Sequence, residues 1–254
     1  LRYLKKIFYN SVAELRVKLL KMSRIVDSQE RDTLIAKMSA GIDACLQLDI
    51  VKNLPDFLLP DGKGNVYSYA SCDMTVIDNR LVNVISFRQN KGIKEPLYCG
   101  ELYIDAENNA LVQARLEINP AYVRQATDMF IERKTRKWKI TAQEVVYTIS
   151  YRQWNGIYYM NHIRGDLYFK VKLKRQWFSA SSLHTWFEMV TCKVDVDNVT
   201  RFQRKERMPT RTIFSDTHFK YDADFWGEFN VIPWEEELGT VIEKLSPKIE
   251  QIEY

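Results

Sequence analysis

Between Glu144 and Val196 apolar and polar side chains alternate along the chain, which is typical of successive β-strands with one buried face. In the clearest run the apolar positions are Leu167, Phe169, Val171 and Leu173, and the intervening positions are Tyr168, Lys170, Lys172 and Lys174. The pair Asn155-Gly156 favours the positive φ angles of a tight hairpin turn. The pattern predicts an antiparallel sheet with one apolar face. The four apolar side chains are candidate lining of a hydrophobic groove.

Other stretches also favour strands, on alternation and on the turn residues between them. These are Leu81–Arg88, Leu97–Asp105, Ala110–Ile118, Trp138–Arg152 and Trp177–Cys192. Asn108-Asn109 lies between the second and the third of them and indicates a hairpin.

Helical spacing is found mainly near the N-terminus. Apolar residues at Leu4, Phe8 and Val12 favour a helix up to about Val12. The continuation is ambiguous, because Val17 and its apolar neighbours also alternate with basic residues as in a strand. Further helices are expected over Ser39–Asn53, over Ala121–Phe130 after Asn119-Pro120, and over Glu235–Leu245.

These elements predict an α+β fold with one large curved antiparallel sheet, similar to a half-barrel. The N-terminal helices are expected on its concave face, with a short helix at the C-terminus. A single domain over 1–254 is expected, with a mainly helical or mixed part over 1–65, the sheet over 66–221, and an acidic aromatic tail over 222–254.

Composition supports this picture and adds an uneven charge. Aromatic residues make up 13% of the 254 residues, which favours half-buried sheet. The net charge is +4, but residues 222–254 hold nine acidic and two basic side chains, so they carry −7 and the rest of the chain carries +11. We interpret this as an acidic tail that docks on or near a basic body.

Two basic stretches carry much of the positive charge. One contains Arg133, Lys134, Arg136, Lys137 and Lys139, and the other contains Lys170, Lys172, Lys174 and Arg175. Alternate lysines on a strand are typical of a solvated outer face, which is the favoured interpretation. An anionic partner or a lipid headgroup is the alternative, with Lys170, Lys172 and Lys174 as the partner face. Nucleic acid is not expected as a partner.

No catalytic, cofactor-binding or metal-binding residues are assigned from the sequence. His162, His184 and His218 are scattered, and His184 and Glu188 on one strand would lie about 13 Å apart. The chain has no nucleophile elbow and no glycine-rich phosphate loop. We therefore expect a protein that is not an enzyme and has no cofactor.

The cysteines and the hydropathy add little about location. Cys45, Cys72, Cys99 and Cys192 form no CxxC pair, and buried free thiols are favoured over two disulfides. No run of the sequence is long and apolar enough to span a membrane. The chain begins at Leu1, and any export signal is expected upstream of it.

Several short sequence segments resemble those of a known protein family. They are Leu48-Asp-Ile-Val-Lys-Asn53, Val84-Ile-Ser-Phe87, Gly100-Glu-Leu-Tyr-Ile-Asp105, Arg164-Gly-Asp-Leu-Tyr-Phe169 and Phe225-Trp-Gly-Glu-Phe-Asn-Val-Ile232. Together they resemble the C-terminal region of the carboxypeptidase-like regulatory-domain-containing proteins of Gram-negative cell envelopes. The resemblance runs from about Asp32 to the end of the chain. It also extends, in architecture, to half-barrel carriers of lipoproteins.

The resemblance implies a periplasmic or outer-membrane-associated protein. The family label refers to an upstream domain and implies no peptidase activity here. The main hypothesis is a non-enzymatic envelope binding module that holds a hydrophobic or lipid-like ligand in the curved sheet. The alternative is a structural or adaptor domain that contacts an outer-membrane protein, and the remote alternative is a hydrolase.

Overall fold

The computed structural model describes residues 2–9, 15–25, 36–38, 42–59, 66–134, 136–175, 180–197, 199–200, 202–206 and 249–253. The chain divides into two compact units. The first comprises Leu1–Leu34, Gly41–Asp43 and Cys192–Tyr254, and the second comprises Ile35–Ala40 and Ala44–Thr191. The organisation as a single domain, expected from the sequence, stays a prediction.

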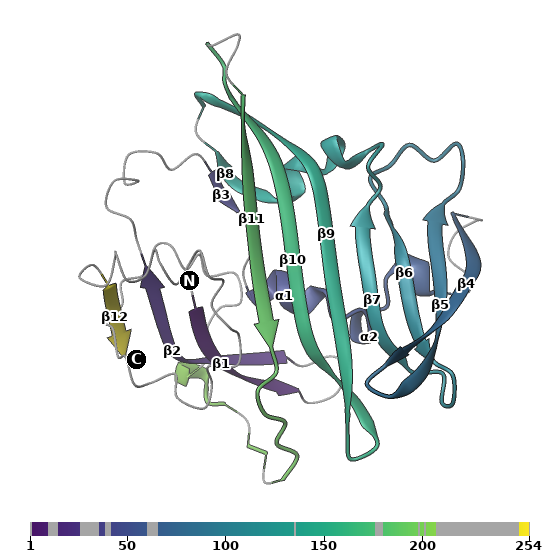
Figure 1. The fold of residues 1–254 in the computed structure, drawn as a ribbon. Helices are drawn as coiled ribbons and strands as arrows, with labels where there is room; N and C mark the ends of the chain where they lie inside the picture. Colours follow the sequence, from purple (N-terminus) through teal and green to yellow (C-terminus); the bar gives the residue numbers. More distant parts are fainter. Residues whose placement is uncertain are drawn as a thin grey trace. The chain divides into compact units, whose positions relative to one another are not determined.

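The second unit is built on one open antiparallel sheet in the order β11-β10-β9-β7-β6-β5-β4 (Figure 1). Its strands are β4 (Tyr67–Ile77), β5 (Arg80–Gln89), β6 (Tyr98–Asp105), β7 (Leu111–Ile118), β9 (Trp138–Trp154), β10 (Ile157–Leu173) and β11 (Ala180–Val190). The antiparallel sheet and six of these strands confirm the expectation from the sequence, whereas β4 was not expected. The half-barrel curvature and the placement of helices on a concave face stay predictions.

Three hairpins, β4–β5, β6–β7 and β9–β10, turn at the same end of this sheet. Asn155 and Gly156 have φ angles of 49° and 80°, as their sequence predicts for a tight turn. Asp78 and Asn79 have φ angles of 49° and 61°, so the β4–β5 turn also places two residues in the left-handed region. This end of the sheet is called the hairpin end below.

The core of the second unit follows one row of paired residues across the sheet. The row is Leu102, Ala114, Ile149, Ile163 and Met189, and the strand register places them side by side from β6 to β11. All five are buried. Because paired residues of antiparallel strands project to the same side, this row identifies the apolar face of the sheet.

Short elements accompany the sheet. They are α1 (Ile42–Gln47), α2 (Ile50–Asn53), η2 (Asp56–Leu58), η3 (Val123–Met129), and a small ladder of β3 (Ala36–Met38) with β8 (Ile131–Lys134). The single helix expected over Ser39–Asn53 is wrong in detail, because the helix is interrupted at Leu48 and Asp49. The helix expected over Ala121–Phe130 is a 3₁₀ helix, which begins after Asn119 accepts hydrogen bonds from the backbone of Ala121 and Tyr122.

The first unit contains a three-stranded antiparallel sheet of β1 (Arg2–Tyr9), β2 (Leu15–Ile25) and β12 (Ile249–Glu253), and the short helix η4 (Arg204–Glu206). The helix expected up to Val12 is therefore wrong over the described residues 2–9. The strand-like alternation around Val17 was the correct signal, since pairing of β1 with β2 overrides helical spacing. The terminal helix expected over Glu235–Leu245, and most of the acidic tail, lie outside the described residues.

Candidate functional site

One face of the β4–β5 hairpin carries exposed apolar side chains. Val76 pairs directly with Leu81, and Met74 lies two residues before Val76, so these three side chains share one face of the ladder. Their exposed fractions are 64% for Val76, 49% for Leu81 and 51% for Met74. Isolated exposed apolar residues are common on protein surfaces, but three on one face of one hairpin form a patch.

This patch shares its face with the aromatic part of the core. Phe87 lies six residues after Leu81 on β5 without a change of register, and it pairs with Tyr69 on β4. A bulge at Cys72 restores the alternation, so Tyr69, Met74 and Val76 all project to this side. Tyr69 is 51% exposed. The face of Tyr69, Met74, Val76 and Leu81 is called the β4–β5 apolar face below.

Phe57 of η2 covers the inner end of this face. Its ring is stacked on that of Phe87 at 4.5 Å between centroids and lies edge-on to Tyr67 and Tyr98 at 6.2 Å each. The hydroxyl of Tyr69 donates a hydrogen bond to the backbone oxygen of Phe57 at 2.8 Å. Burial and the nearby carboxylate of Asp56 raise the pKa of Tyr67 to about 12, so its hydroxyl stays neutral.

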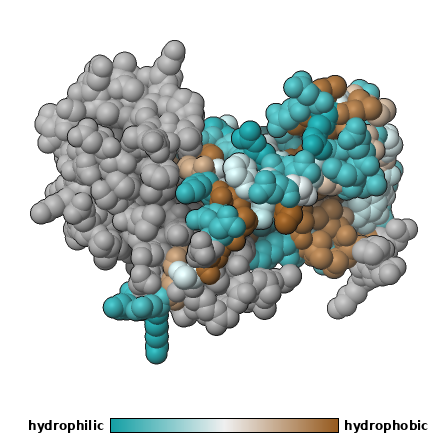
Figure 2. Space-filling view, turned by 90° about the horizontal axis from the view of Figure 1, so that it is seen from below, coloured by the Kyte–Doolittle hydropathy of each residue, from teal (hydrophilic) through white to brown (hydrophobic). Residues whose placement is uncertain are grey.

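The segment that carries Phe57 adds further exposed apolar side chains. Val51, Leu54 and Leu59 are 51%, 52% and 41% exposed, although Phe57 itself is buried. Figure 2 shows hydrophobic surface, in brown, among hydrophilic surface in a view from the hairpin end. Buried aromatic rings beside exposed aliphatic side chains form an ordered apolar surface to which an apolar ligand can bind.

The groove lining expected from the sequence lies elsewhere in the sheet. Leu167, Phe169 and Val171 are only 3%, 1% and 2% exposed, and Leu173 is half-buried. Three of the four are thus enclosed by the protein's own side chains. Their role as ligand lining stays a prediction, and exposed apolar side chains of the sheet lie instead on β4 and β5 and at Trp154 and Ile157 of the β9–β10 hairpin.

The lysines of the expected partner face project away from this core. Lys170 and Lys174 are exposed and Lys172 is half-buried. Lys170 and Lys172 alternate with Phe169 and Val171 along β10, and Lys174 follows the end of the strand. Lys172 pairs with Lys139 of β9, and the backbone N–H of Lys174 donates to the oxygen of Lys137 at 2.9 Å. The register therefore brings the two basic stretches of the sequence side by side.

A charged cluster lies farther along the same face of β10 and β11. Arg164 binds Asp166 at 2.7 Å through Nε and Glu188 at 3.0 Å through Nη1. His184 Nε2 lies 3.0 Å from Asp166 Oδ1, and His162 Nε2 lies 3.7 Å from Glu188 Oε1. Burial by itself raises the pKa of Asp166, but the hydrogen bonds from Arg164 and His184 outweigh it and lower that pKa.

Aromatic rings flank this cluster. The Arg164 guanidinium lies 5.2 Å from the centre of the Trp186 ring, and the His184 ring is stacked on Tyr168 at 4.2 Å. In the described part of the chain no serine, threonine or cysteine is hydrogen bonded to either histidine, and no three ligating side chains could hold a metal ion. His162 and His184 are nevertheless paired with carboxylates, so the hydrolase alternative is neither supported nor removed. His218 lies outside the described residues.

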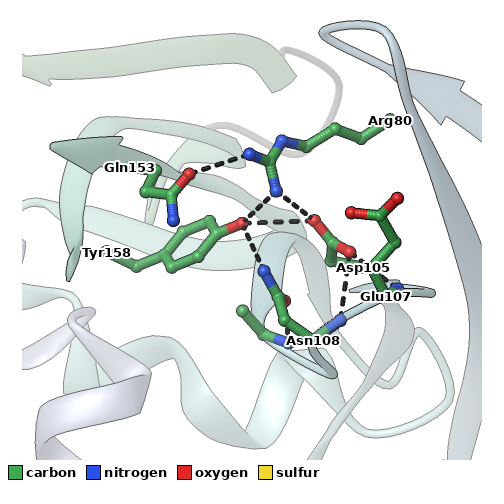
Figure 3. A network of polar contacts seen from close by, with 7 residues as sticks. Arg80, Asp105, Glu107, Asn108, Gln153 and Tyr158 are labelled. Carbon is green, nitrogen blue, oxygen red and sulfur yellow. Dashed lines mark hydrogen bonds and ion pairs between the residues drawn. The ribbon is translucent and has the colours of Figure 1, made fainter. Parts of the chain in front are cut away.

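At the hairpin end one guanidinium joins three hairpins (Figure 3). Arg80 Nη1 binds Asp105 at 2.7 Å and the Tyr158 hydroxyl at 3.0 Å, and Nη2 binds Gln153 at 2.8 Å. Asn108 also donates to the Tyr158 hydroxyl at 3.2 Å. The Asp105 side chain is 1% exposed, and the hydrogen bonds from Arg80 and from the Glu107 backbone lower its pKa.

A second buried carboxylate lies beside α2. The Tyr151 hydroxyl donates to Asp49 Oδ1 at 3.1 Å and accepts from the Val51 backbone N–H at 3.3 Å. Burial raises the pKa of Asp49, and the hydrogen bond from Tyr151 offsets part of that effect. Burial likewise raises the pKa of Tyr151. The contact ties the chain before Phe57 to the centre of the sheet.

The cysteines do not fit the expectation of four buried thiols. None of the four forms a disulfide, but only Cys45 is buried, Cys99 is half-buried, and Cys72 and Cys192 are exposed. Burial raises the pKa of the Cys99 thiol, which keeps it protonated. Cys72 occupies the bulge of an exposed edge strand, a position that no sequence signal indicated.

The sequence did not indicate the β4–β5 apolar face or the Arg80 contacts. The helices of the described residues are all too short to cross a membrane. No family model, no curated protein and no solved structure matches this chain.

Proposed function

We propose that the second unit is a non-enzymatic binding module that holds a hydrophobic, acyl-chain-like ligand on the β4–β5 apolar face. The observation that supports this most is the exposure of Met74, Val76 and Leu81 on one face of one hairpin. Each methylene of a chain that leaves water contributes about 0.8 kcal/mol. A ligand that covers several of these side chains therefore gains enough free energy for measurable binding.

Two features of the geometry support an apolar ligand on this face. Asp73 is the only charged residue of β4, and the strand register places it on the opposite face. The aromatic rings of Phe57 and Phe87 hold the neighbouring part of the face rigid. Rigid surroundings lower the entropy cost of binding, since few side chains must be ordered.

Titration with the fluorescent fatty acid cis-parinaric acid tests the proposal. Val76→Lys places an ammonium group against the ligand, and we expect its dissociation constant to rise at least about tenfold. Thr75→Lys is the matched control, because Thr75 lies on the same strand, is exposed and pairs with Val82 on the other face. Its affinity should stay within about twofold of the unmodified protein.

Two outcomes would overturn the proposal. One is equal affinity of the Val76→Lys and Thr75→Lys variants for the fatty acid. The other is a self-associating protein that Val76→Lys converts to a monomer without any change in fatty-acid binding, because the face would then be covered by a second copy. Lipids found by mass spectrometry of the protein purified from its native host would support the proposal independently.

The proposed setting is the periplasm or the outer membrane, as the family resemblance implies. A lipid-like ligand fits that setting. Cell fractionation with an antibody against the full-length protein tests it, and recovery in the cytoplasmic fraction alone would refute it. The adaptor alternative rests on the lysines of β10 and is independent of the β4–β5 apolar face.

A further inference from the structure

Positive charge is concentrated at the end of the β9–β10 ladder opposite to the hairpin end. Residues 133–143 contain five basic and no acidic side chains, and residues 167–187 contain four lysines and arginines and no acidic side chain. Lys139 pairs with Lys172, and the same register continues to Lys137 and Lys174. The fold thus joins two stretches that are more than 30 residues apart in sequence.

Lys139, Lys170 and Lys174 are exposed. Lys170 lies between the buried residues Phe169 and Val171 of β10, and Lys139 lies on the same side because it pairs with Lys172. Lys174 directly follows Leu173, the last residue of the strand. Lys170 pairs with Thr141 on one side and with Ser182 on the other. The surface of Lys139, Lys170, Lys172 and Lys174 is called the basic end below.

Lys139, Lys170 and Lys174 hold positive charge at exposed positions within this end of the ladder. A partner of opposite charge is attracted to such a surface, so the arrangement favours association with an anion.

We infer that the basic end binds an acidic protein segment in extended conformation. Lys170 and Lys172 lie on alternate residues of β10, which spaces them by about 6.6 Å, and Lys174 follows two residues later, just past the end of the strand. Carboxylates on alternate residues of an extended peptide have the same spacing. The neighbours of Lys170 across the ladder, half-buried Thr141 and exposed Ser182, are small and polar.

This chemistry is distinguishable from that of other anions. Single-stranded nucleic acid needs aromatic rings on which its bases can stack, whereas Tyr168, an exposed ring two residues before Lys170, already has one side stacked on His184 at 4.2 Å. A lipid surface does not depend on the spacing of carboxylates along a chain. Binding of an acidic peptide should therefore depend on the spacing of its carboxylates, whereas binding of nucleic acid or of a lipid surface should not.

Fluorescence anisotropy with two labelled peptides provides the test. One peptide alternates Glu with Ser, and the other has the same composition with the Glu residues in one block. We expect the alternating peptide to bind at least about threefold more tightly. The triple variant Lys139→Glu, Lys170→Glu and Lys174→Glu should weaken its binding at least about tenfold and flatten the salt dependence.

The control is the triple variant Arg88→Glu, Lys91→Glu and Arg152→Glu. It changes the net charge equally at exposed positions, and Arg152 lies about 40 Å from Lys139 along β9. Its affinity should fall less than about threefold. If the first variant does not fold, as judged by circular dichroism, Lys170→Glu alone should weaken binding about twofold to threefold.

Three results would overturn the inference. One is equal loss of affinity in both triple variants, which would indicate only the overall charge. Another is equal binding of the two peptides. The third is binding of phosphatidylserine vesicles or oligothymidine, lost in the Lys139, Lys170 and Lys174 variant, without binding of either peptide. None of these variants touches the β4–β5 apolar face, so the two proposals fail independently.

Discussion

Replacement of Gly165 by Ala tests the packing of the aromatic side chains against β10. A Cβ atom at Gly165 would lie 2.5 and 2.6 Å from two carbons of the Phe187 ring and 3.0 Å from Cδ1 of Tyr147. Ordinary contacts between carbon atoms are about 3.5–4.0 Å. The added methyl group therefore forces the Phe187 ring to move by about an ångström.

The magnitude follows from two opposing effects. Overpacking of this size costs about 1–3 kcal/mol. Removal of a glycine from a strand interior contributes roughly 0.5–1 kcal/mol in the opposite direction, because the unfolded chain loses conformational freedom. Phe187 is half-buried on edge strand β11, so its ring has room to shift. We expect Gly165→Ala to lower the free energy of unfolding by about 1–2 kcal/mol.

The double-mutant cycle with Phe187→Ala makes the reasoning specific. Without the ring, Gly165→Ala should be neutral or raise the free energy of unfolding by about 0.5–1 kcal/mol. Urea unfolding of the four proteins, followed by tryptophan fluorescence, gives the coupling. An equal effect of Gly165→Ala in both backgrounds would refute the packing of Phe187 over Gly165. Phe187→Leu is the second background if the Ala variant does not fold.

Three further predictions concern the same unit. Gly100→Ala should prevent folding or lower the free energy of unfolding by more than about 3 kcal/mol. The φ angle of Gly100 is +151°, and a Cβ atom there would lie 1.9 Å from the backbone oxygen of Arg115. Soluble yield and urea unfolding measure this effect. Phe169→Ala should cost about 3–5 kcal/mol in the same assay, because the side chain is only 1% exposed, and a cost below about 1 kcal/mol would contradict its place in the core. The lowered pKa of Asp105 stabilises the protein above the ordinary carboxyl pKa, and this stability is lost as the pH falls through the lowered value. Arg80→Met should therefore flatten the acid side of a plot of unfolding free energy against pH. An unchanged slope would contradict the pairing of Arg80 with Asp105.

The central strands could be predicted from the sequence because one of their faces is buried. In β10 Leu167, Phe169 and Val171 are enclosed while Tyr168 and Lys170 are exposed, and this contrast is the alternation visible in the sequence. The turn at Asn155-Gly156 was readable for an equally local reason, since glycine and asparagine tolerate positive φ.

Strand β4 was missed for the opposite reason. Its residues from Ser68 to Val76 are exposed on both faces, so no alternation marks the strand, and a bulge at Cys72 shifts the faces. The turn Asp78-Asn79 was the available signal, because both residues tolerate left-handed conformations. Since the β4–β5 apolar face depends on this strand, the candidate site could not be found from periodicity.

Only part of the basic end could be predicted from the sequence. Lys170, Lys172 and Lys174 were identified from alternation within one strand. Their proximity to Lys139 depends on the register of β9 with β10, which is set by the hairpin turn and by two bulges, one after Met160 and one between Tyr168 and Phe169. The contacts of Arg80 depend in the same way on residues up to 78 positions away, which no local pattern encodes.

The guanidinium of Arg80 couples the opening of the three hairpin turns. Since one side chain binds groups from the β6–β7 and β9–β10 hairpins, the three turns cannot fray one at a time without breaking its bonds. Backbone amides near Ile77, Ala106 and Ile157 should then exchange their hydrogens for deuterium through a common opening event. Their exchange rates should converge in the intact protein and diverge once Arg80 is replaced.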